Sequence, residues 1–197
     1  SGIGYYQQQV ENPVIIWDQV NVTIHTEDNR IDVGKEATIT YEAMYGYDGE
    51  QFSGLVLLND TGLSQDYVGK RGYAVEKIQD NKYGLTKFST NEVYVVWDRV
   101  NVILGILNPR IEVGSVANLT WTGFYEYDGE SFSGTIKLND TLTKNVMGKY
   151  GYKVASIIDP KYDLEVFTTN EAYCILDRIK EEISFETILP GSIKVTV

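Results

Sequence analysis

The sequence is poor in the residues on which disulfide frameworks, zinc sites and nucleic-acid binding depend. Its 197 residues include one Cys and one His, which excludes an internal disulfide and the usual zinc ligand sets. Lys and Arg number 17 against 28 Asp and Glu, and a net charge of -11 leaves no basic stripe for phosphate binding. No apolar run approaches the roughly 18 residues of a spanning helix. We therefore expect no nucleic-acid partner and no membrane span in this chain.

What the sequence does contain is an internal repeat. Trp17–Val22 returns as Trp97–Val102, and Tyr45–Gly54 returns as Tyr125–Gly134, at residue numbers 80 higher. Beyond a one-residue deletion the match continues at numbers 79 higher, as from Thr90 to Thr169. A period of this length is too long for a solenoid and suits a small sandwich domain. The chain is therefore predicted to hold two copies of one domain.

Each copy has the residue pattern of β-strands. The odd-numbered positions from Ala37 to Tyr47 are apolar or aromatic, whereas Thr38, Thr40 and Glu42 alternate with them, which indicates a half-buried antiparallel strand. Asp48–Gly49 follows directly, and Asp-Gly is a strong signal for a hairpin turn. No segment has the apolar periodicity of a long helix. We predict an all-β fold of two tandem immunoglobulin-like Greek-key β-sandwich modules with extra terminal strands.

The repeat boundaries divide the chain into four segments. The junction Val93–Ile103 has no Gly, Pro or Ser spacer, so we expect nearly continuous strand there, stiffer than a Gly/Ser linker. The predicted segments are an N-terminal strand segment at 1–16, the first module at 17–97, the second module at 98–177, and a C-terminal strand segment at 178–197. The last begins a third repeat or supplies donor strands.

Both terminal segments contain strand-like pieces without a complete module around them. Val14–Trp17 matches the closing strand of a module, and the alternation around Ile193 and Val195 is typical of a strand that docks on another sheet. Two explanations remain open. The chain is a piece of a longer tandem array, or its C-terminal strands complete a sheet of the next copy in a head-to-tail filament. The candidate inter-subunit residues are Val14, Ile15, Ile16, Ile193, Val195 and Val197.

Four sequons mark candidate glycosylation sites, which makes glycans candidate partners. They begin at Asn21, Asn59, Asn118 and Asn139. Asn59 and Asn139 occupy equivalent turns that follow a strand. The alternative interpretation is that these two asparagines only make the turn, with their side chains bonded to their own backbone.

The remaining polar residues give little indication of a reaction. Carboxylates such as Asp48 and Asp128 could serve only Ca²⁺, but their spacing matches no calcium loop, so solvated turn residues are favoured and no cofactor is predicted. His25 aligns with Gly105, so no catalytic triad can be built twice, and no enzymatic activity is predicted. Cys174 replaces Val95 and is expected to be a small buried hydrophobe.

Aspartates recur at every module boundary, at Asp18, Asp98 and Asp177. Arg99 and Arg178 follow two of them. An ion pair between these neighbours would brace adjacent modules, although an exposed pair contributes only about 0–1 kcal/mol.

The order of the repeated motifs resembles tandem immunoglobulin-like modules of archaeal cell-surface proteins. The motifs are Tyr-Asp-Gly, Phe-Ser-Gly and Leu-Asn-Asp, then Gly-Lys-Tyr-Gly-Tyr, Thr-Asn-Glu and Trp-Asp-Arg-Val, and the resemblance covers Val14 to Ile179. It implies an extracellular surface-layer, stalk or filament component without enzymatic activity, and it carries no functional residues.

We therefore predict a structural component of an extracellular surface structure, built head to tail from copies of itself by strand complementation. The alternatives are an adhesin or carbohydrate-binding tandem module that uses Ca²⁺, or an accessory region of a large secreted protein.

Overall fold

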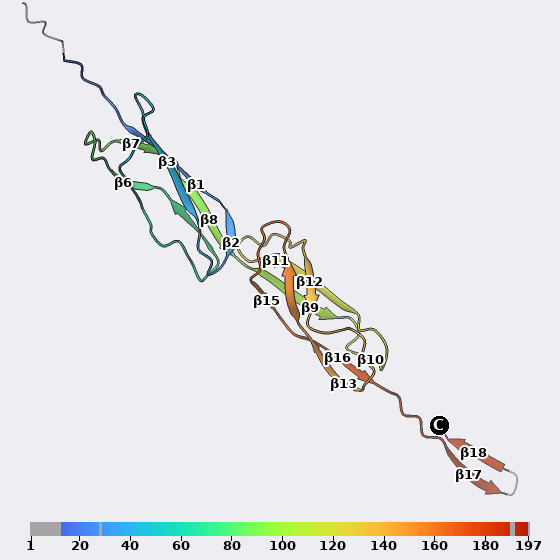
Figure 1. The fold of residues 1–197 in the computed structure, drawn as a ribbon. Coiled ribbons are helices and arrows are strands. Elements are labelled where there is room, and N and C mark those ends of the chain that lie inside the picture. The colour runs from blue at the N-terminus through green and yellow to red at the C-terminus, as the bar shows by residue number, and fades with distance from the viewer. Residues whose placement is uncertain (1–12, 28, 190–191, 197) are drawn as a thin grey trace, which may run out of the picture. The chain divides into compact units, whose positions relative to one another are not determined.

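The chain folds into two tandem immunoglobulin-like β-sandwich modules (Figure 1). The computed structural model describes residues 13–27, 29–189 and 192–196, with the backbone alone from residue 184 onward. Every regular element in these ranges is a β-strand, which confirms the all-β prediction. In the same ranges, no helix is long and apolar enough to cross a membrane.

Two compact units contain the described residues. The first unit holds the described residues up to Arg30, together with Gly34–Asp66 and Lys70–Val96. The second holds the described residues from Trp97 onward, together with Ile31–Val33 and Tyr67–Gly69.

The strands of the first repeat form two three-stranded sheets and one strand pair, with orders β3-β1-β7, β2-β8-β5 and β4-β6. β1 pairs antiparallel with β3 and parallel with β7, so neighbours in a sheet are not neighbours in sequence. The strands are β1 (Val20–Thr26), β2 (Arg30–Asp32), β3 (Ile39–Tyr45), β4 (Leu55–Leu58), β5 (Gly69–Tyr73), β6 (Val75–Gln79), β7 (Phe88–Thr90) and β8 (Val93–Asp98).

The second repeat has the same sheets in the same order, β11-β9-β15, β10-β16-β13 and β12-β14. Only Arg99 separates β8 from the first strand of this repeat, as the extended junction in the sequence predicts. The strands are β9 (Val100–Ile106), β10 (Arg110–Glu112), β11 (Leu119–Tyr125), β12 (Thr135–Leu138), β13 (Gly148–Tyr152), β14 (Val154–Ile158), β15 (Phe167–Thr169) and β16 (Ala172–Asp177).

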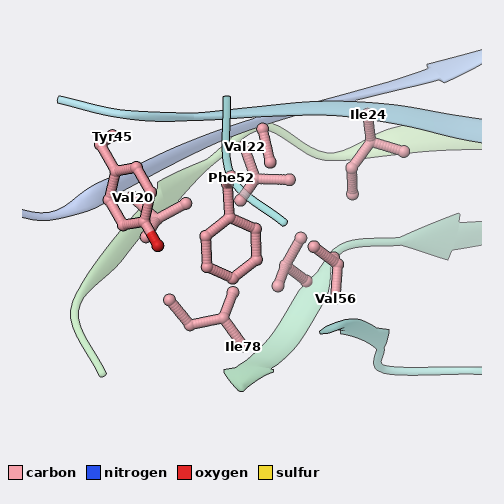
Figure 2. Packing of buried hydrophobic residues seen from close by; sticks show 9 residues of the cluster. Val20, Val22, Ile24, Tyr45, Phe52, Val56 and Ile78 are labelled. Atoms are coloured by element: carbon pink, nitrogen blue, oxygen red, sulfur yellow. The ribbon is translucent and has the colours of Figure 1, made fainter. Parts of the chain in front are cut away.

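The core of each repeat forms on the middle strand of one sheet. In β1, Val20, Val22 and Ile24 are buried, whereas the residues between them are exposed. Figure 2 shows these three side chains packed with residues of other strands and loops, among them Tyr45 and Phe52. The rings of Tyr45 and Phe52 meet edge to face with centroids 5.7 Å apart, a favoured aromatic geometry.

The predicted hairpin at Asp48–Gly49 is present but short. After the turn, Met44 and Gln51 form an antiparallel bridge, and Phe52 donates its N–H to the Ala43 carbonyl at 3.0 Å. Gly49 has a φ of 72°, and the Asp48 side chain accepts the N–H of Glu50 at 3.0 Å. After this turn, β4 pairs with β6 and not with β3. Phe52, which lies between this bridge and β4, is buried in the core.

The expected inward face of β3 is only partly buried. Ala43 and Tyr45 are buried as predicted, but Tyr41 is 46% exposed and Tyr47 is 67% exposed. β3 lies at the edge of its sheet, so part of its apolar face has no neighbour.

A separate strand pair follows the second repeat. β17 (Ser184–Leu189) pairs antiparallel with β18 (Ser192–Thr196). The candidate inter-subunit residues Ile193 and Val195 pair through their backbones with Thr187 and Phe185. Their side chains, the whole of Val197 and residues 1–12 of the predicted N-terminal segment lie outside what the structure describes.

We expect Trp97→Ala to lower the free energy of unfolding by about 3–5 kcal/mol, because the indole is fully buried. Trp97→Leu should cost clearly less, since Leu176 takes the equivalent place in the second repeat at 1% exposure. Urea denaturation measures both, with Trp121→Ala, at 37% exposure, as the control. A leucine variant as unstable as the alanine variant would contradict the equivalence of the two positions.

Candidate functional site

The densest polar cluster of the first repeat surrounds Asp80, just after β6. Its carboxylate accepts the hydroxyl of Tyr45 at 2.8 Å and the backbone N–H groups of Lys82 at 2.9 Å and Leu85 at 3.0 Å. Nearby, Lys82 forms an ion pair with Glu50. Asp80, Lys82 and Leu85 lie in the loop after β6, and Glu50 lies in the loop after β3. The cluster therefore fixes these two loops to Tyr45 at the end of β3.

The second repeat contains the same cluster around Asp159. Tyr125 donates its hydroxyl to Asp159 at 2.7 Å, and Leu164 donates its N–H at 3.3 Å. Lys161 forms an ion pair with Glu130. Both copies therefore use a carboxylate, a buried tyrosine and a lysine in the same structural role.

Burial and hydrogen bonding shift the titration of these groups. Burial and the hydrogen bond to Asp80 raise the pKa of Tyr45 to about 12, and the same causes raise the pKa of Tyr125. Burial also acts to raise the pKa of Asp80, but its N–H donors and the Tyr45 hydroxyl outweigh burial and lower the pKa. The Asp80 carboxylate is thus held in its charged form by donors from the protein itself.

The contacts of the turn carboxylates Asp48 and Asp60 bear on the calcium alternative. Asp48 and Asp60 each accept a backbone N–H two residues further along the chain, from Glu50 and Gly62. In the described ranges, no three His, Cys, Asp or Glu side chains are grouped so that they could hold a metal ion. The contacts agree with the interpretation that these carboxylates are turn residues.

The paired sequon asparagines tie their turn to a neighbouring strand connection. The side chain of Asn59 accepts the N–H of Ala74 at 3.0 Å and donates to the carbonyl of Gly72 at 3.4 Å. Asn139 makes the equivalent bonds with Lys153 and Gly151. The turn-making interpretation assumed bonds to the asparagine's own backbone, whereas the partners lie more than ten residues further on. Glycosylation of these two residues remains a prediction.

The other two sequon asparagines lie on a middle strand and next to an outer strand. Asn21, in β1, accepts the hydroxyl of Ser89 at 2.7 Å. Asn118 is exposed beside β11. Glycosylation at both stays a prediction as well.

The boundary aspartates hold the start of each repeat through backbone N–H groups. The Asp98 carboxylate accepts the N–H groups of Arg99 at 2.8 Å and Tyr127 at 2.9 Å. Asp18 makes the same bonds with Gln19 and Tyr47. The expectation of an ion pair with the following arginine is not met at Asp98, because the Arg99 guanidinium pairs with Glu126, with Nη2 2.8 Å from Oε1.

At the third boundary, the Asp177 carboxylate accepts the N–H of Arg178 at 2.9 Å. Its ion-pair partner is Arg110, at 3.6 Å, rather than the arginine that follows it.

Cys174, three residues before Asp177, is fully buried as predicted, and burial raises the pKa of its thiol.

Two surface hollows lie at different ends of the repeat, one in each unit. In the first unit, a hollow is lined by Trp17, Asp18, Tyr47 and the loop 84–87. In the second unit, a hollow is lined by β10 together with Asp177, Arg178 and Ile179. Sequence reasoning missed both hollows, because no motif marks them and their residues are far apart in the chain.

The exposed segment Val14–Trp17 adjoins the first of these hollows. Val14, Ile15, Ile16 and Trp17 are 84%, 76%, 54% and 90% exposed, and none of them belongs to a strand. A contiguous apolar segment of this kind marks an interaction surface. The structure thus places the N-terminal candidate residues together on the surface.

No known protein-family model matches the chain, and no curated protein matches it. Among solved structures, the D0-D1 domain of Intimin is similar at 16% sequence identity and a TM-score of 0.24. The match covers 78% of this chain and 96% of that one. Function therefore has to be inferred from the surfaces of the chain itself.

We expect Asp98→Ala to destabilise the protein by about 1–3 kcal/mol, because it leaves two N–H groups near a fully buried position without their acceptor. Asp18→Ala should cost less, since Asp18 is only partly buried and water can replace the carboxylate. Calorimetric unfolding of both variants tests this difference. Equal losses would show that burial of Asp98 does not matter.

The stability of the first repeat should fall in acid partly through Asp80. Its folded pKa is lowered, so its stabilising contribution is present above the unfolded pKa of about 3.9 and is lost as the pH falls through the folded value. Asp80→Asn should therefore be most destabilising near neutral pH, and its difference from the wild type should shrink toward pH about 2. Urea denaturation across this pH range measures the difference, and a constant difference would contradict the linkage.

Proposed function

We propose that the chain is a structural component of an extracellular surface structure and that its copies join head to tail into a filament or stalk. In this proposal, exposed strand segments of one copy pair with open sheet edges of its neighbours. The motif resemblance to archaeal cell-surface modules supports the extracellular setting. The proposal assigns the chain no enzymatic activity.

The observation that carries the proposal is the contrast between two equivalent segments. Val93–Trp97 lies in β8, where Val95 and Trp97 are fully buried. In the matching segment, Ile15 and Trp17 are 76% and 90% exposed. Burying one such side chain is worth about 1.5–3 kcal/mol, so the segment has a strong drive to associate with a sheet.

Open sheet edges that could accept a strand are present in the second unit. β10 and β13 are the outer strands of the sheet β10-β16-β13, and each can accept one more strand. The pair β17–β18 has only two strands, and such a pair is marginally stable unless it joins a larger sheet. Donation of strands in both directions between copies would bury all of these edges.

The test combines sedimentation with the fluorescence of Trp17. The full chain should form larger species as its concentration rises, and the exposed Trp17 should lose its access to iodide at the same concentrations. Ile15→Glu should abolish both changes, because Ile15 matches the inward residue Val95.

The matched control is Val14→Glu, since Val14 corresponds to Tyr94, which is 43% exposed in β8. This variant should assemble nearly as well as the wild type. A chain that stays monomeric at every concentration, with Trp17 always open to iodide, would refute the proposal. Equal effects of the two glutamates would refute the predicted inward face.

A further inference from the structure

A short contact inside the second unit shows what one end of a repeat can bind. This unit includes Ile31–Val33, and there the Asp32 carboxylate accepts the backbone N–H of Glu165 at 3.0 Å and that of Val166 at 2.9 Å. Two adjacent N–H groups on one carboxylate form a charge-assisted pair of bonds. The contact therefore joins a residue of β2 to the loop before β15.

Apolar side chains next to this contact are closed off from water. Ile31 is 4% exposed and Leu164 is 2% exposed. Ile31 precedes Asp32 in the sequence, and Leu164, which precedes Glu165, packs in the core of the second repeat. The arrangement is stabilised by both burial and hydrogen bonding.

The repeat supplies a second copy of each half of this contact. On one side, Ile111 and Glu112 correspond to Ile31 and Asp32, at residue numbers 80 higher. On the other side, Leu85 corresponds to Leu164, and 86–87 corresponds to 165–166, at numbers 79 lower. The two halves lie at the hollows of the second and first units.

In these second copies the same surfaces are open. Ile111 and Leu85 are half-buried, and Glu112, Thr86 and Lys87 are exposed. Within the described residues, the Glu112 carboxylate has no hydrogen-bond or ion-pair partner, and the N–H groups of Thr86 and Lys87 have no acceptor. Two complementary halves of a contact that is formed elsewhere in the chain are therefore both available.

We propose that the Glu112 carboxylate of one copy accepts the backbone N–H groups of Thr86 and Lys87 of a second copy, with Ile111 packed against Leu85. The occupant of the Leu85 hollow is thus β10 of another molecule of the same chain. Lys87 replaces Val166 at this place, so its ammonium group adds an attraction for the carboxylate that the contact at Asp32 lacks.

Two segments outside any strand border the same two hollows. Val14–Trp17 and the exposed segment 178–183 that follows β16 belong to no strand, and Trp17 and Ile179 line the hollows of the first and second units. This inference rests on head-to-tail association and shares β10 with the strand proposal. It depends on the Glu112 side chain, whereas strand addition uses the backbone of β10, so a change of the Glu112 side chain alone tests the two separately.

Disulfide trapping between two variants tests the contact. Both variants carry Cys174→Ala, which removes the buried thiol; one adds Arg110→Cys in the same hollow as Glu112, and the other adds Thr86→Cys. Mixed under mild oxidation, they should give a covalent dimer. The matched control replaces Thr86→Cys by Lys77→Cys on exposed β6, and should give at least about tenfold less dimer, a ratio that corresponds to about 1.4 kcal/mol.

A sedimentation experiment on Glu112→Gln and Glu76→Gln provides the second arm. Glu112→Gln should weaken self-association at least about tenfold, whereas the exposed Glu76 of β6 lies outside both hollows and its variant should match the wild type. Assembly that persists in Glu112→Gln without trapped dimer overturns this contact and leaves the strand proposal standing. A chain that never associates overturns both.

Discussion

Burial of alternate residues on β1 and β9 is the constraint on which the rest of the structure depends. Each is the middle strand of its sheet, and Val20, Val22, Val100 and Val102 are at most 3% exposed. A shift of one residue would turn this buried face to water, so the register of the neighbouring strands is fixed by it. The turns, the polar clusters and the ends of each repeat are then placed by strands whose register cannot slip.

The polar residues of the interior serve this framework. Asp80 and Asp159 hold two loops against a buried tyrosine, and Asp98 holds the first residues of the second repeat. The acceptors that the structure shows in use bond to hydroxyl and N–H groups of the protein itself. At the ends of the repeats, apolar and polar groups that line the two hollows are open to water, and the proposed association would use them.

Equivalent positions of the two copies differ in their exposure to water. The contact at Asp32 is closed, whereas its counterparts at Glu112 and at Thr86–Lys87 are open. Likewise Trp97 is fully buried and Trp17 is 90% exposed. The two copies of the repeat thus leave different surfaces open, at Glu112 in the second copy and at Trp17 in the first. In the proposed assembly, such surfaces of different molecules would meet head to tail in a contact that does not close.

The sequence by itself determined the all-β class, the two copies and most inward positions, because a period of two residues along a strand is a local property of the chain. It also placed Cys174 in the core, since the repeat aligns it with Val95. Only the tertiary structure decided that the turn at Asp48–Gly49 leads to another sheet, that Arg99 pairs with Glu126, and that two hollows lie at the ends of the repeats. These features depend on which strands become neighbours across long stretches of chain, and pairing of that kind is fixed by packing in three dimensions rather than by local residue pattern.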